Sequence, residues 1–165
     1  MKVAIIMGSD SDWPTLEIAE RTLLSFGVQT EVVVASAHRT PEIVHEFAQG
    51  AEARGVKVII AAAGAAAHLP GVIAAYTTLP VIGVPINATS LQGMDALLSI
   101  AQMPAGIPVA CMAVDGAKNA ALFAVEILAT SDEKLRKLLV ENRAKMKQEV
   151  AAKAARLTDL RQQKA

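Results

Sequence analysis

Apolar runs and amphipathic segments alternate along the chain. Five runs rich in apolar and β-branched residues predict buried strands near residues 3–7, 31–35, 58–62, 81–84 and 108–114. The segments that follow them carry apolar residues at helical spacing and predict helices near residues 11–27, 41–55, 69–76, 95–102 and 117–130. This alternation favours an α/β fold, a three-layer αβα sandwich around a parallel five-stranded sheet.

Polar residues and prolines mark the expected helix starts. Ser11 is expected to cap the first helix and Thr40 the second, which begins at Pro41. The second helix is expected to turn one apolar stripe toward the core, formed by Ile43, Val44, Phe47, Ala48 and Ala51.

The segment 131–165 differs in character from residues 1–130. It holds ten Lys and Arg against five Asp and Glu, whereas the rest of the chain holds six against eleven. Apolar residues recur in it at roughly helical spacing, namely Leu135, Leu138, Leu139, Met146, Val150, Leu157 and Leu160. We expect a catalytic domain over 1–130 and, over 131–165, a helical extension of that domain whose apolar seam contacts a neighbouring subunit. The alternative is a solvated helix whose basic face binds nothing specific.

Composition narrows the class of protein. With 165 residues, 53 % of them hydrophobic and 19 % charged, the chain can bury the core of one domain. Its formal net charge of zero gives no electrostatic reason to expect nucleic acid or a membrane as a partner. Cys111 is the only cysteine and no signal-peptide pattern is visible, so a cytoplasmic location is expected.

The stretch from Val58 to Met94 contains no Asp, Glu, Lys or Arg. Glycines and prolines interrupt it and alanine supplies much of its apolarity, so it does not predict a membrane span. Burial in a sheet and in subunit contacts explains it better, which favours a tightly packed oligomer.

Polar clusters follow the first two predicted strands, at Gly8–Asp12 and Ser36–Pro41. Because the carboxyl ends of parallel strands open onto one edge of the sheet, these clusters are expected to converge there. Ser9 and Ser11 stand where backbone N–H groups favour an anion such as phosphate, although Ser11 can equally be a simple cap. Asp12 can face sugar hydroxyls or merely complement the helix dipole.

His38 and Arg39 are the most informative pair. An imidazole can give and take a proton near neutral pH, and a guanidinium forms a fork suited to phosphate, to which Ser36 adds a hydroxyl. After the third strand, Gly64 allows close backbone approach, and His68 can contact a ligand or cap the next helix. His45 is expected on a solvated face. The three histidines and Cys111 lack the spacing of metal ligands, so no metal is expected.

Longer motifs surround these residues. They are Met7–Asp12, Ser36–Pro41, Ala66–Gly71, Gln102–Val109 and Gly116–Leu122. Over about residues 3–130 the chain resembles the class I 5-(carboxyamino)imidazole ribonucleotide mutases of purine biosynthesis. It departs from them at Ala65, where glycine is frequent, and in a slightly short stretch between Val114 and Gly116.

The resemblance implies a flavodoxin-like sheet and a homo-octamer that uses no metal or organic cofactor. It implies that His38 is the general acid/base, that Ser9, Ser11, Ser36 and Arg39 hold the phosphate, and that Asp12 holds the ribose. Gly64 would line the pocket for the imidazole and its carboxylate, with His68 close by.

The implied reaction interconverts 5-carboxyaminoimidazole ribonucleotide and 4-carboxy-5-aminoimidazole ribonucleotide by decarboxylation and recarboxylation with trapped CO2, in de novo purine (IMP) biosynthesis. The first alternative is an aminoimidazole ribonucleotide carboxylase that uses CO2 directly. An alternative of another class is a flavodoxin-like binding or signalling module. A phospho-receiver, however, needs an aspartate at the end of the third strand, where this chain has Ala61, Ala62 and Ala63.

Overall fold

The computed structural model describes residues 1–162. Strands and helices alternate as predicted. The strands are β1 (Lys2–Met7), β2 (Gln29–Val34), β3 (Val56–Gly64), β4 (Val81–Ile86) and β5 (Ala110–Cys111). The helices are α1 (Trp13–Ser25), α2 (Pro41–Gly50), α3 (Leu69–Tyr76), α4 (Met94–Ala101), α5 (Ala117–Ala129) and α6 (Glu133–Gln162), and a short 3-10 turn, η1 (Asp10–Asp12), precedes α1.

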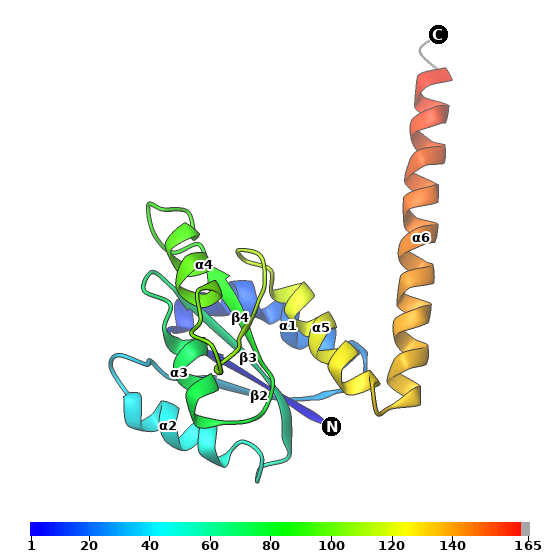
Figure 1. The fold of residues 1–165 in the computed structure, drawn as a ribbon. Helices are drawn as coiled ribbons and strands as arrows, with labels where there is room; N and C mark the ends of the chain where they lie inside the picture. Colours follow the sequence, from blue (N-terminus) through cyan, green and yellow to red (C-terminus); the bar gives the residue numbers. More distant parts are fainter. Residues whose placement is uncertain (163–165) are drawn as a thin grey trace.

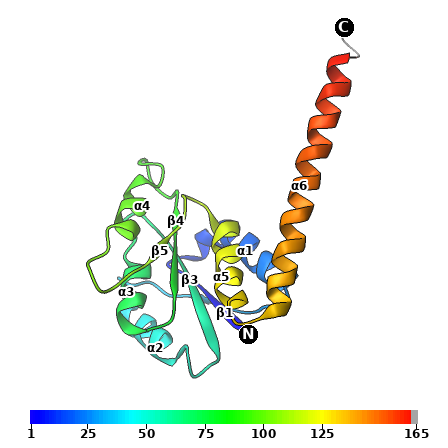
Figure 2. The ribbon, with the colours of Figure 1, turned by 45° about the vertical axis from the view of Figure 1, so that its right-hand side comes forward.

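The strands form one parallel sheet in the order β2-β1-β3-β4-β5, which confirms the predicted α/β fold. Helices α1 and α5 cover one face, and α2, α3 and α4 cover the other (Figures 1 and 2). Every strand therefore ends at the same edge of the sheet, and the loops that follow β1, β2, β3 and β4 meet there.

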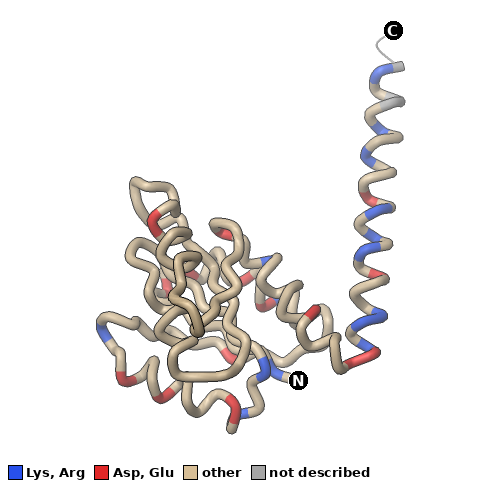
Figure 3. The backbone as a smooth tube through the Cα atoms, viewed as in Figure 1, with Lys and Arg blue, Asp and Glu red and all other residues tan. Residues whose placement is uncertain are grey.

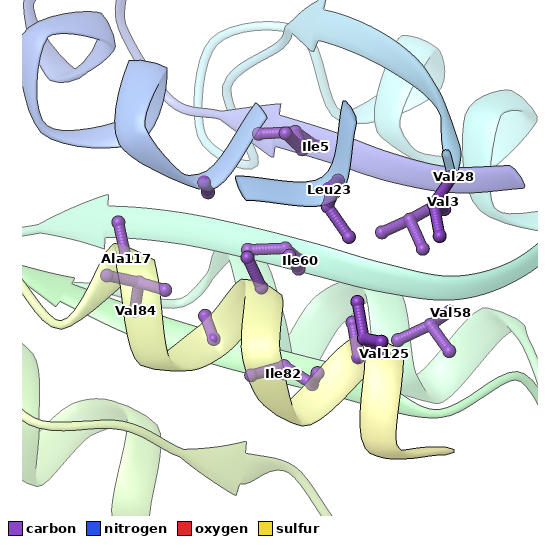
Figure 4. Packing of buried hydrophobic residues seen from close by; sticks show 14 of the residues in the cluster. Val3, Ile5, Leu23, Val28, Val58, Ile60, Ile82, Val84, Ala117 and Val125 are labelled. Carbon is purple, nitrogen blue, oxygen red and sulfur yellow. The ribbon is translucent and has the colours of Figure 1, made fainter. Parts of the chain in front are cut away.

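The alternation of side chains along the central strands divides the core into two clusters. Val3 and Ile5 of β1 face α1 and α5, whereas Ala4 and Ile6 face the opposite layer. Figure 4 shows the first cluster, in which Leu23 of α1 and Val125 of α5 pack beside Ile60 of β3. Because both faces of the central strands are buried, they read as continuous apolar runs.

Three local predictions are wrong in detail. Ser9 rather than Ser11 caps the chain reversal after β1, since its Oγ accepts a hydrogen bond from the backbone N–H of Ser11. Thr40 precedes α2 as expected, but its hydroxyl bonds to the backbone of Ser36 instead of capping the helix. Ile43 is 48 % exposed, because at 100° per residue it falls outside the arc covered by Val44, Phe47, Ala48 and Ala51.

β5 is also shorter than predicted, and Ala65 has an unusual backbone conformation. The strand predicted over 108–114 pairs with β4 only at Ala110 and Cys111. Pro108, at the start of the predicted strand, has no backbone N–H to donate to a ladder. Ala65 has φ +53°, a left-handed conformation in which a side chain is unfavourable by about 1–2 kcal/mol. A glycine at this position would carry no such strain.

The extension over 131–165 forms α6, and residues 163–165 lie outside the described residues. Its first turns pack on α5, with Leu135 buried and Leu138 and Leu139 half-buried. The rest projects from the sheet layers as a single rod rich in Lys and Arg (Figures 1 and 3). Of the helices described, none combines the length and the apolarity needed to cross a membrane.

Candidate active site

A cavity of about 350 Å³ opens at the carboxyl edge of the sheet. Its walls come from the loops after β1, β2, β3 and β4. All eight residues singled out in the sequence line it, namely Ser9, Ser11, Asp12, Ser36, His38, Arg39, Gly64 and His68. The predicted convergence of these loops is therefore observed, although convergence alone does not assign a role to any of the residues.

The two serines lie together at the start of η1. The Ser11 hydroxyl lies within donating distance of both Ser9 Oγ, at 2.8 Å, and Asp12 Oδ1, at 3.4 Å, and Ser9 donates to Asp10 Oδ1 over 3.3 Å. Gly8 extends β1 by one bond, its N–H donating to the carbonyl of Ala62. This arrangement presents two hydroxyls and the adjoining backbone to the cavity, a suitable surface for phosphate oxygens.

Among the described residues, Asp12 is the one buried carboxylate at this edge, with only 6 % of the residue exposed. Burial raises the pKa of its carboxyl above the ordinary 3.8, and the charge of Asp10 adds to this effect. Hydrogen bonds from the Ser11 side chain and the Ser9 backbone oppose it. A partly desolvated carboxylate is a strong hydrogen-bond acceptor for a hydroxyl, which suits a sugar better than a second anion.

Arg39 joins the loop after β2 to the loop after β1. Its Nη2 donates to the carbonyl of Gly8 over 3.1 Å, and its Nε donates to Ser36 Oγ over 3.4 Å. Within residues 1–162 no carboxylate forms an ion pair with it. The guanidinium is therefore held in place while its positive charge stays available for a bound anion.

The two cavity histidines contact each other directly. Nε2 of His38 lies 2.8 Å from Nδ1 of His68, and the rings meet edge to face with their centroids 5.0 Å apart. Both are exposed to the cavity, so His68 is not confined to a capping role. His45, which was expected on a solvated face, is half-buried against Tyr76 outside the cavity, with ring centroids 4.6 Å apart.

Position 64 requires glycine, which has no side chain, for a reason that the sequence does not reveal. A Cβ added there would lie 2.6 Å from the Cβ of Ala88, so Ala88 packs directly on the end of β3. Ala88, in the loop after β4, also lines the cavity. Sequence reasoning missed it because alanine carries no reactive group. Its place after the fourth strand was the one available signal.

Comparisons with known proteins agree with this picture. The family model described as AIR carboxylase matches residues 2–149. N5-carboxyaminoimidazole ribonucleotide mutase of Pyrococcus horikoshii is 55 % identical over 158 residues, covering 96 % of this chain and 89 % of that protein. The protein of the same name from Mycobacterium tuberculosis is 52 % identical over 159 residues, covering 96 % and 91 %.

Solved structures give the same result for the fold. A crystal structure of Treponema denticola PurE superposes with a TM-score of 0.86 at 29 % identity, covering 94 % of this chain and 98 % of that one. The family model matches most of the chain, the two relatives are more than half identical to it, and the fold is shared. The protein therefore belongs to the AIR carboxylase family.

Proposed function

We propose that this protein is a mutase of de novo purine biosynthesis that interconverts 5-carboxyaminoimidazole ribonucleotide and 4-carboxy-5-aminoimidazole ribonucleotide. Relatives of that name match nearly the whole chain. The observation that carries the proposal is the position of His38, which lines the same cavity as the Arg39 guanidinium and the hydroxyls of Ser9 and Ser11. An acid/base group thus stands beside a surface suited to a sugar phosphate.

Different side chains of the cavity bind different parts of the substrate. Ser9, Ser11, Ser36 and Arg39 hold the phosphate, since together they offer hydroxyl donors and an unpaired cation. Asp12, buried beside Ser11, accepts hydrogen bonds from the ribose hydroxyls. The ring then extends toward His38 and the small side chains around Gly64 and Ala88.

The chemistry is a transfer of the carboxyl group through CO2. The bond between the exocyclic nitrogen and the carboxylate breaks, its electron pair stays on nitrogen, and protonated His38 donates a proton there. Ring carbon C4 next attacks the released CO2, and neutral His38 removes the C4 proton to restore aromaticity. One proton is given and one is recovered, so His38 ends each turnover as it began.

Retention of CO2 in the cavity makes the second step effectively unimolecular. Escape would turn recapture into a bimolecular reaction at low CO2 concentration. Small, apolar walls formed by Ala63, Ala65, Ala66 and Ala88 suit an uncharged molecule of this size. No metal or organic cofactor takes part in the proposed scheme.

We further propose a homo-oligomer, an octamer as the resemblance implies, in the cytoplasm. On α6, Val140 and Val150 are each 65 % exposed and Leu157 is 60 % exposed. A helix that projects as a rod with apolar residues in water gains stability when these residues pack on a neighbour. Sedimentation of a variant carrying Val150→Glu and Leu157→Glu should show a lower mass than the original chain, whereas Lys147→Glu on the same helix should not.

A direct carboxylase is the second candidate, favoured by the description of the matching family model. Two incubations separate the candidates. The purified protein receives 5-carboxyaminoimidazole ribonucleotide in one, and aminoimidazole ribonucleotide with bicarbonate in the other. Efficient turnover of the first substrate alone supports the mutase, and efficient turnover of the second at low bicarbonate supports the carboxylase.

A further inference from the structure

Asp115 has an unusual conformation in the turn between β5 and α5. Its φ of +55° lies in the left-handed region, where residues other than glycine are uncommon. Its backbone N–H donates to the carbonyl of Pro85 over 2.9 Å, and its Oδ1 accepts the N–H of Asn87 over 3.1 Å. Both partners belong to the end of β4 or the residue just after it, so Asp115 binds this segment with main chain and side chain together.

The Asp115 side chain accepts a hydrogen bond from a backbone N–H that the turn after β4 does not itself satisfy. In the tight turn after β4, the N–H of Ala88 donates back to the carbonyl of Ile86 over 3.0 Å. The N–H of Asn87, in the middle of that turn, is bonded to Asp115 instead. Asp115 therefore fixes the direction in which the chain leaves β4.

The residue placed by this turn is Ala88. It lines the cavity and packs on Gly64 so closely that an added Cβ would lie 2.6 Å away. The same β5–α5 turn also supports the far end of the loop, because a Cβ on Gly93 would lie 2.6 Å from Val114 Cγ1. The loop 87–93 is thus held at both ends by residues 114–115.

We propose that Asp115 is a positioning residue that holds Ala88 in the cavity wall and thereby limits escape of CO2 during the carboxyl transfer. Asp115 is absent from the residues that line the cavity, so it acts through Asn87 and Ala88. Only the kinetic consequence rests on the proposed function; the positioning of the loop stands on the contacts alone.

Two substitutions separate the hydrogen bond from the backbone conformation. Asp115→Gly keeps the left-handed φ accessible and removes the acceptor, whereas Asp115→Asn tolerates the same φ and keeps an acceptor oxygen. In Asp115→Gly we expect about a fivefold to tenfold rise in the fraction of turnovers that release aminoimidazole ribonucleotide and CO2 in place of carboxylated product. Asp115→Asn should stay within twofold of the original chain. A purely structural role would lower stability without changing this product ratio.

Amide hydrogen exchange at Asn87 tests the positioning without any turnover. We expect exchange about tenfold faster in Asp115→Gly and near the original rate in Asp115→Asn. If the original chain shows no turnover, the proposed function is overturned. The exchange rates at Asn87 would then still test the placement of the loop. An unchanged product ratio in Asp115→Gly, unchanged exchange in that variant, or equal losses in both variants would overturn the inference.

Discussion

The imidazoles of His38 and His68 share a hydrogen bond of 2.8 Å between Nε2 and Nδ1, although 30 residues separate them along the chain. His38 follows β2 and His68 precedes α3, so the bond joins two loops at the carboxyl edge of the sheet. One ring must donate and the other accept, which restricts the orientation of His38 before any ligand arrives.

The contact predicts a supporting role for His68. Replacing His68 with Gln removes the hydrogen bond between the two rings, worth about 1 kcal/mol, so kcat should fall about fivefold to tenfold while KM changes little. Steady-state kinetics on the carboxyamino substrate measures this. His45→Gln, which alters a histidine outside the cavity, should leave both constants unchanged. Complete loss of turnover in His68→Gln would instead make His68 part of the proton path.

Arg39→Lys tests the phosphate assignment. Lysine keeps the charge but cannot contact Gly8, Ser36 and a phosphate at once, as the planar guanidinium can. Loss of a charge-assisted bond worth about 1.5–3 kcal/mol should raise KM about 10-fold to 150-fold, with kcat changed far less. Arg21→Lys, on the outer surface of α1 in an ion pair with Glu17, serves as the control and should not alter KM. An unchanged KM in Arg39→Lys would remove Arg39 from the phosphate site.

Gly64→Ala tests the packing of β3 against the loop after β4. The new methyl group would lie 2.6 Å from Ala88 Cβ, so the free energy of unfolding should fall by about 1–3 kcal/mol. Urea denaturation measures the loss, and adding Ala88→Gly should restore most of it. Gly8→Ala is the matched control, because among residues 1–162 nothing beyond the two chain neighbours lies within 4 Å of its added Cβ. That variant should fold normally and bind the ribonucleotide less tightly, since Gly8 lines the cavity. Equal stability of Gly64→Ala and the original chain would contradict the packing argument.

Asp12→Asn tests the cost of burying a carboxylate. Because the folded state raises the pKa of Asp12 above 3.8, its contribution to stability is greatest below that value and is lost as pH rises through the folded-state pKa. The Asn variant should therefore gain in Tm relative to the original chain at pH 7, and this gain should shrink as the pH falls toward 4. The hydrogen bonds lost in the variant change its Tm equally at pH 4 and at pH 7. The test is therefore how the Tm difference between variant and original chain changes from one pH to the other.

Asp10→Asn provides the comparison for this experiment, because Asp10 is exposed. It should keep the affinity for the ribonucleotide, whereas Asp12→Asn should bind it more weakly. A Tm difference for Asp12→Asn that is the same at pH 4 and pH 7 would contradict the desolvation argument.

The sequence could predict which loops meet but not how they touch. Ser9, Arg39 and His68 reach one edge because each adjoins the end of a parallel strand, and strand order did not need to be known. The bond between His38 and His68 depends on the detailed course of two loops, which no local pattern encodes. The sequence did not identify Ala88 because alanine carries no reactive group. It did not identify Asp115 because this residue acts through the backbone N–H of Asn87.

The sequence also could not show which of two similar residues takes a given local role. Ser9 and Ser11 are equally good caps by type, and only the observed 3-10 turn favours Ser9. The apolar seam of α6 was visible, yet Val150, Leu157 and Leu160 at its far end are 65 %, 60 % and 49 % exposed, because the helix leaves the domain after its first turns.

The most direct test of the account is the replacement of His38 with Asn, with ligand binding and turnover measured on the same preparation. Asparagine preserves approximate size and polarity but cannot exchange protons near neutral pH. We predict that affinity for the ribonucleotide, measured by calorimetry, stays within about threefold, and that turnover falls by at least about a hundredfold. Turnover within tenfold of the original protein, with binding intact, would contradict the assignment of His38 as the acid/base group.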